Sequence, residues 1–261
     1  MTIKLVMSTL ILWLSLWYPL TSLAACEKPI RVGMAANFPP LVFKRGEALY
    51  GIEVDLSREL KKYLGCSIQR VEMPWLELFP ALESGEVDLV MSGVSITSDR
   101  RERLAFTEPY MSLGQMAIIR RENIAVKPRS LDELLRDVDT VGYETGTTGE
   151  SYALRYRDVV SLKGYDGPKE GLMALQRKEI SLFIHDAPTS WLLASEAEYQ
   201  DLVSMYRMLT NEDIAWVVSK DRPLLLKKLN SALLDLRERG RLNDIINRWI
   251  PITVQADARE Y

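Results

Sequence analysis

The sequence predicts an α/β protein built from two lobes of related plan. Past residue 28, short β-rich runs alternate with helical patterns, which is typical of parallel sheets flanked by helices. Residues 81–91 and 174–184 repeat one pattern: the end of a helix, a tight turn and an apolar strand. A chain of 261 residues can hold one large domain or two small ones. The alternation and the repeat together favour two.

The N-terminal segment indicates export. Residues 5–25 follow Lys4, are almost wholly apolar and end in small residues. This order is typical of a secretory signal peptide, which we place at residues 1–25. A membrane anchor is the alternative, because the run approaches the ~20 residues that span a bilayer. Pro19 and the small residues behind it favour cleavage.

The elements of the first half alternate regularly. Residues 30–35 form the first expected strand. Apolar residues recur at every fourth position from residue 52 to residue 64, which predicts a helix with one apolar stripe. A strand at 67–72, a helix at 76–84 and a strand at 87–91 follow.

One further amphipathic helix is expected near the end of the chain. Leu225, Leu229, Leu233 and Leu236 share one face, and Pro223 stands at the start, where a missing N–H costs nothing. Residues 251–261 form a polar tail.

The loops after the two repeated strands carry the candidate binding groups. Residues 92–100 offer hydroxyls, a glycine and the guanidinium of Arg100, and residues 185–188 offer the carboxylate of Asp186. Ligands of such sheets bind beyond the carboxyl ends of strands, where strand order switches. A cation and an anion that meet in one cleft would suit a zwitterion.

Composition excludes some partners. The formal net charge is −3, and no basic tract suggests binding to nucleic acid. The sequence shows neither a metal-ligand cluster nor a nucleophile–base pair, so we expect no metal and no cofactor.

The two cysteines leave two uses open. Residues 23–26 look like a lipobox, which would make Cys26 the acylated first residue of a lipoprotein. Alternatively, Cys26 and Cys66 precede strands that would be parallel neighbours, at a separation that a disulfide permits. Acylation would leave Cys66 unpaired, which is unusual in an exported protein, so the disulfide is favoured.

Four segments occur in a specific order. They are Val32-Gly33 with Phe38-Pro39-Pro40; residues 51–56; residues 92–110, ending Phe106-Thr107-Glu108-Pro109-Tyr110; and residues 142–150, with Gly146-Thr147-Thr148-Gly149-Glu150. Through them the chain resembles the family 3 extracellular solute-binding proteins of amino-acid ABC transporters, over roughly residues 28–250.

The resemblance implies a two-lobed fold of the periplasmic-binding-protein type (type II), each lobe a mainly parallel sheet flanked by helices. Two crossover strands, at 115–120 and 213–218, would join the lobes. The first lobe would hold residues 27–116 plus 216–250, and the second residues 117–215.

The resemblance also implies a transport role. A small-molecule ligand, an amino acid or similar zwitterion, binds one open lobe, the hinge closes, and the closed form docks on the membrane subunits of an ABC permease. We expect a periplasmic monomer. A lipid anchor at Cys26 is the alternative location.

The resemblance assigns the two charged ligand contacts. Arg100 matches the arginine that binds the ligand α-carboxylate, a role that suits a planar guanidinium. Asp186 matches the acid that accepts the ligand ammonium. The alternatives are a solvated arginine beside Arg101 and Arg103, and a helix cap before Pro188.

Smaller groups complete the expected site. Ser95 and the backbone of Gly93 would bind the ligand from the first lobe. Thr148, with Thr147 in the turn at residues 146–149, would bind it from the second lobe. Plain turn chemistry ahead of a helix is the alternative for this turn.

Aromatic and acidic positions would set the side-chain preference. Phe38 and Trp75 match positions that flank the ligand side chain, with core packing as the alternative. Glu144 stands where relatives with basic ligands usually carry an apolar residue, and Ala35 stands where they carry an acid. For Glu144 a solvent-facing side chain is slightly favoured over a ligand contact. His185, the single histidine, is assigned no chemistry.

Two other functions remain open. Exported enzymes of this fold dehydrate prephenate or arogenate, and here only Glu144, Asp186 or His185 could serve as the acid or base. A ligand-sensing receptor for a separate partner is the third possibility. We expect a binding protein and not an enzyme.

Overall fold

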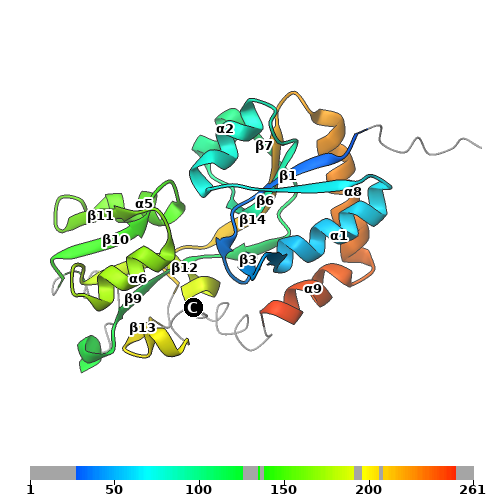
Figure 1. The fold of residues 1–261 in the computed structure, drawn as a ribbon. Helices are drawn as coiled ribbons and strands as arrows, with labels where there is room; N and C mark the ends of the chain where they lie inside the picture. Colours follow the sequence, from blue (N-terminus) through cyan, green and yellow to red (C-terminus); the bar gives the residue numbers. More distant parts are fainter. Residues whose placement is uncertain (1–27, 126–134, 136–137, 191–195, 206–207, 251–261) are drawn as a thin grey trace, which may run out of the picture.

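The computed structural model forms two bodies, each a mixed sheet with helices on both faces (Figure 1). The two-lobed α/β architecture predicted from the sequence is therefore confirmed. The structure describes residues 28–125, 135, 138–190, 196–205 and 208–250. The predicted signal peptide, Cys26 and the polar tail lie outside the described residues.

The first lobe is built on the sheet β5-β1-β6-β14-β7, with β8 also paired to β14. β1 is parallel to β5 and β6, whereas β14 is antiparallel to β6, β7 and β8. A small antiparallel sheet, β2-β3-β4, follows β1 along the chain. The bounds are β1 (Ile30–Met34), β2 (Asn37–Phe38), β3 (Val42–Arg45), β4 (Ala48–Tyr50), β5 (Ile68–Glu72), β6 (Leu89–Ser95), β7 (Leu104–Phe106), β8 (Met111–Leu113) and β14 (Glu212–Ser219).

Helices cover both faces of this sheet. On one face α1 (Ile52–Leu64), α8 (Pro223–Glu238) and α9 (Arg241–Trp249) bury their apolar sides together. The stripe predicted from residue 52 faces this core, and the helix ends at Gly65, whose φ of 64° suits glycine. On the other face lie η1 (Trp75–Glu77) and α2 (Leu78–Glu83). The sequence reasoning did not predict α9.

The second lobe is built on the sheet β11-β10-β12-β9-β13, in which β10 is parallel to β11 and β12. β9 is antiparallel to β12 and β13. α5 packs on one face and α6 on the other. The bounds are β9 (Gln115–Arg120), β10 (Thr140–Glu144), α5 (Thr148–Ala153), β11 (Ser161–Tyr165), α6 (Pro168–Gln176), β12 (Leu182–Asp186) and β13 (Leu202–Ser204).

The internal repeat corresponds to one unit in each lobe: α2 leads into β6, and α6 leads into β12. Both helices end in the same turn. Gly85 and Lys178 occupy the same place in it, with φ of 75° and 61°. In both turns the next amide bonds back to a helix carbonyl, Glu86 to Ala81 at 2.8 Å and Glu179 to Ala174 at 3.0 Å. Each unit delivers a strand to the centre of its sheet.

The predicted strand at 87–91 is shorter than the observed one. β6 begins at Leu89 and continues to Ser95, four residues past the expected end. The extension pairs with β14, where Ile214 lies opposite Ser95. Residues 92–95, the first part of the loop that was expected to bind the ligand, therefore belong to a fully buried strand.

The chain passes between the lobes beside β9 and β14. The whole of β9 pairs within the second sheet and the whole of β14 within the first. The two connecting segments, just before β9 and just before β14, lie in contact, since a Cβ added to Gly114 would lie 2.0 Å from the carbonyl oxygen of Thr210. The exact lobe boundaries stay a prediction.

Of the two cysteines, Cys66 lies within the described residues. β1 and β5 are parallel neighbours, with Ile30 opposite Ile68, and the Ile30 amide donates to the Ser67 carbonyl at 2.8 Å. Cys66 is buried beside this strand start. Its pairing with Cys26 stays a prediction. In the described part of the chain, no helix combines the length and apolar character needed to cross a bilayer.

Candidate functional site

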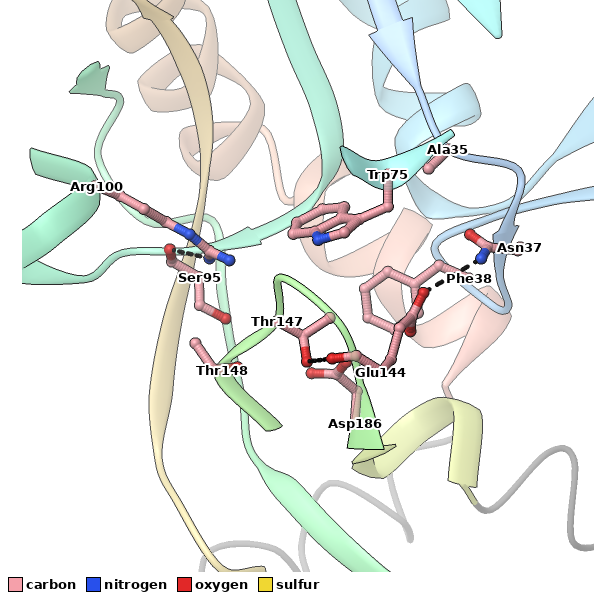
Figure 2. Close-up of a pocket in the computed structure, with 11 residues that line it drawn as sticks. Ala35, Asn37, Phe38, Trp75, Ser95, Arg100, Glu144, Thr147, Thr148 and Asp186 are labelled. Carbon is pink, nitrogen blue, oxygen red and sulfur yellow. Dashed lines mark hydrogen bonds between the residues drawn. The ribbon is translucent and has the colours of Figure 1, made fainter. Parts of the chain in front are cut away.

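One pocket between the lobes contains every residue that was predicted to contact a ligand (Figure 2). It lies where β1 and β6 of the first lobe end opposite β10 and β12 of the second. The pocket also includes Ala35 and Asn37. From the first lobe the lining residues are Ala35, Asn37, Phe38, Trp75, Gly93, Ser95 and Arg100, and from the second they are Glu144, Thr147, Thr148 and Asp186.

Arg100 points into the pocket and does not lie on a solvated helix face. It belongs to α3 (Ser98–Arg103), and its guanidinium donates to the Ser95 carbonyl at 2.9 Å and to the Gly146 carbonyl at 3.2 Å. The guanidinium carbon lies 5.4 Å from the ring centre of Trp75 and 5.3 Å from that of Phe79. Rings and carbonyls therefore fix its position.

The charge of Arg100 is not neutralised within the described residues. Burial lowers the pKa of its guanidinium, and the negative charges of Glu212 and Asp186 oppose that shift. An arginine side chain remains charged under such conditions. None of the described carboxylates lies within ion-pair distance of it. A ligand carboxylate would find a positioned, charged donor here.

Asp186 stands at the end of β12, in the opposite lobe from Arg100. Its Oδ1 accepts from Gln115 Nε2 at 2.8 Å. Burial raises the pKa of Asp186 to about 6; His185 acts against this rise, as does the Gln115 hydrogen bond, while the charges of Glu212 and Glu144 add to it. Since its negative charge is costly here, a ligand cation would stabilise it.

Gln115 and Glu212 are polar groups of the site that the sequence reasoning missed. Gln115 Nε2 also donates to Thr148 Oγ1 at 3.0 Å, which links Thr148 to Asp186. Glu212 accepts from Ser95 Oγ at 2.5 Å. Each is the first residue of a strand whose middle is apolar, and that was the available signal. Because the Ser95 hydroxyl donates to Glu212, its lone pairs suit a ligand ammonium.

The turn after β10 joins the lobes. The carbonyl of Gly146 accepts from Trp75 Nε1 at 3.1 Å as well as from Arg100. Thr147 caps α5, since its Oγ1 accepts from the Glu150 amide, and it donates to the Glu144 carbonyl at 2.7 Å. Turn chemistry thus applies to Thr147, which still lines the pocket.

Gly93 is held from below by a buried carboxylate. Its amide donates to Glu53 Oε1 at 3.0 Å, which fixes the backbone of Gly93 where this residue lines the pocket. The φ of 67° requires glycine, and a Cβ would lie 2.4 Å from the Phe38 ring. Glu53 also accepts from Tyr110 at 2.6 Å and from Trp216 at 2.9 Å.

Glu144 is buried, so the slightly favoured expectation of a solvent-facing side chain is wrong. Only 7% of the residue is exposed. Its Oε2 lies 2.9 Å from His185 Nε2, and its Oε1 accepts from Asn37 Nδ2 at 3.3 Å across the lobes. His185 lies on β12 and Asn37 on β2, both far from Glu144 in sequence, and their hydrogen bonds hold the carboxylate inside the pocket.

His185 contacts the pocket carboxylate directly, although no chemistry was assigned to it. The ring stacks on Phe183 and meets Phe38 edge-on, with ring centres 5.8 Å and 6.2 Å apart. Burial alone lowers the pKa of His185, but the hydrogen bond and charge of Glu144, helped by Asp186, outweigh burial and raise it above its ordinary value.

Comparison with known proteins supplies the family. The model of the bacterial extracellular solute-binding proteins, family 3, matches residues 30–252. The chain belongs to this family. A probable histidine-binding protein from Neisseria gonorrhoeae is 30% identical over 234 residues, which are 85% of this chain and 83% of that protein.

Solved structures resemble this family 3 protein along most of its length. A proposed ABC-transporter binding component from Wolinella succinogenes, complexed with lysine, has a TM-score of 0.79 and 27% identity, over 85% of this chain and 96% of that one. An ancestral amino-acid-binding protein, described as a precursor of cyclohexadienyl dehydratase, has a TM-score of 0.77 and 27% identity, over 85% of this chain and 94% of that one.

Proposed function

We propose that this family 3 protein binds a free amino acid in the pocket between its lobes and delivers it to an ABC transporter. One observation carries the proposal: Arg100 and Asp186 come from opposite lobes and line the same pocket. An α-amino acid presents a carboxylate and an ammonium that these two groups complement. Arg100 would bind the carboxylate through two N–H donors.

The ammonium would lie beside Asp186, with the Ser95 hydroxyl and the Gly93 carbonyl as further acceptors. Both acceptors line the pocket, and the Ser95 hydroxyl already donates to Glu212. Phe38 and Trp75 would form the walls for the ligand side chain. Buried polar groups of this kind bind tightly only when all are matched, which gives specificity for the amino-acid backbone.

Hinge closure would couple binding to recognition by the transporter. The lobes touch through Trp75 and Arg100 on the Gly146 carbonyl, and through Thr189 Oγ1, which donates to the Pro39 carbonyl at 2.5 Å. Entry of a ligand needs these contacts to open. We place the hinge at the two connecting segments, where Gly114 and Thr210 are in contact. A closed monomer would then dock on the permease subunits outside the cytoplasmic membrane.

The names of the relatives support binding over catalysis. The Neisseria relative is named for histidine, and the Wolinella structure holds lysine. The neighbour linked to a dehydratase is itself described as an amino-acid-binding protein. A dehydratase reading is therefore not favoured, and an assay for phenylpyruvate formed from prephenate tests it separately.

The binding test compares Arg100→Ala with Arg101→Ala, an exposed neighbour on the same helix. The protein is first unfolded and refolded to remove any co-purified ligand, then screened against the common L-amino acids by thermal shift and calorimetry. The wild type should gain about 2.7 kcal/mol of stability at a hundredfold excess of ligand over Kd.

Arg100→Ala should weaken binding by about 100-fold, since a charged ligand group loses its partner. Arg101→Ala should bind as the wild type does. Equal affinity of Arg100→Ala and the wild type would contradict the proposal.

A further inference from the structure

We propose that Glu144, held by His185 and Asn37, accepts a positively charged ligand side chain and so makes the pocket selective for cationic amino acids. This inference rests on the proposed amino-acid site and adds the class of side chain. It gives Glu144 the role of a specificity-determining residue.

The pocket has two distinct ends. Figure 2 shows Arg100 and Ser95 on one side and Ala35, Asn37 and Glu144 on the other, with the Trp75 ring between. A ligand whose carboxylate binds Arg100 therefore directs its side chain past the aromatic ring. The polar groups at the end of the pocket away from Arg100 are the Glu144 carboxylate and the Asn37 amide.

Charge matching leaves Glu144 for the side chain. Among the described lining residues the charged groups are Arg100, Asp186 and Glu144. The ligand carboxylate matches Arg100, and the ligand ammonium matches Asp186. The remaining carboxylate, Glu144, is buried, and within the described residues its cationic partner is His185, which carries a charge only when its imidazole is protonated. A cation at the end of the ligand side chain would pair with Glu144.

Glu144 has room in its hydrogen bonding for such a donor. A carboxylate offers about four acceptor positions, and within the described residues it accepts from Asn37 at 3.3 Å and from His185 at 2.9 Å. The long bond from Asn37 is readily exchanged for a stronger charged one. Ala35, on the β1 side of the same end, brings no charge of its own.

His185 couples this subsite to pH. A protonated imidazole of His185 neutralises the charge of Glu144. When the imidazole is neutral, the negative charge of Glu144 is available to pair with a cationic side chain of the ligand. The titratable groups that face His185 are Glu144 on β10 and Asp186 on its own strand, with Glu212 beyond Asp186. Phe38 and Phe183 cover the ring. A cationic side chain therefore competes with the proton on His185, and a neutral side chain does not.

The test compares L-arginine with L-citrulline, which has nearly the same shape but no side-chain charge. Calorimetry measures both affinities for the wild type, for Glu144→Gln and for Glu198→Gln, an exposed acid-to-amide control in the second lobe. The wild type and the control should prefer arginine at least tenfold. Glu144→Gln should lose about 30-fold in arginine affinity and stay within about threefold for citrulline.

The arginine-to-citrulline ratio should also rise with pH between 5.5 and 8 in the wild type and stay flat in Glu144→Gln. Taking the ratio removes the titration of Asp186, which affects both ligands alike. A variant that loses both ligands equally would show that Glu144 is merely structural, and a wild-type ratio that is flat in pH would refute the role of His185.

Preference of the wild type for neutral or acidic amino acids would overturn this inference and leave the proposed function standing. Failure of every amino acid to bind would overturn both.

Discussion

Asp186 carries a charge that its surroundings disfavour, and this determines how binding should depend on pH. Burial raises the pKa of Asp186 to about 6 in the ligand-free protein. A bound ammonium favours the ionised form, so the bound complex holds fewer protons than the free protein. Ligand affinity should therefore fall as the pH drops through about 6.

At pH 5 the affinity for any bound amino acid should be about tenfold lower than at pH 7, because Asp186 is then mostly protonated. Asp186→Asn should bind about 100-fold more weakly at pH 7 and lose this pH dependence. Asp158→Asn, an exposed acid in the same lobe, is the control. Calorimetry between pH 5 and pH 8 measures the ligand affinity of all three proteins. Unchanged affinity at pH 5 in the wild type would refute the role of Asp186.

The sequence predicted the positions of Arg100 and Asp186 because both come at or shortly after the end of a buried strand, although Asp186 is the last residue of β12 and Arg100 lies in α3 rather than in loops. It could not predict the burial of Glu144. That side chain turns inward because of Asn37 and His185, which are 107 and 41 residues away along the chain. Gln115 was missed for a similar reason, since its partners Asp186 and Thr148 come from two other elements.

At the scale of elements, the first turn of α1 ties the binding loop to the core. Glu53 reaches Gly93 on β6, Trp216 on β14 and Tyr110 ahead of β8. Burial raises the pKa of Glu53 to about 7, although these three hydrogen bonds oppose the rise. The Gly51–Leu56 segment was recognisable in the sequence, but the function of its acid needed the three strands around it.

The stability of the protein should reflect this buried acid. The folded protein binds a proton at Glu53 more tightly than the unfolded chain, so this stabilisation is complete below about pH 4.5 and is lost as the pH rises through 7. The loss is about 3 kcal/mol. Urea unfolding of the wild type and Glu53→Gln at pH 5 and pH 7.5 measures the difference.

Glu53→Gln should be less stable than the wild type at pH 5, because its amide nitrogen would face the indole N–H of Trp216. Its stability should change less between the two pH values than that of the wild type. Identical pH dependence of the two proteins would show that Glu53 does not titrate in this range.

At the scale of the whole molecule, the two-lobed plan followed from the alternation of elements and the repeat. Each lobe has the same helix–turn–strand unit, and in each the strand ends at the pocket. How closely the lobes approach could not be read from the sequence. It depends on contacts between residues of different lobes, such as Trp75 with the Gly146 carbonyl and Thr189 with the Pro39 carbonyl.

The central claim is that one amino acid is held between a guanidinium of one lobe and a carboxylate of the other. A crystal structure of the protein with L-arginine tests it most directly. We predict the α-carboxylate on Arg100, the α-ammonium beside Asp186 and the side-chain guanidinium on Glu144. An arginine bound outside the pocket, or one whose α-carboxylate lies away from Arg100, would contradict it.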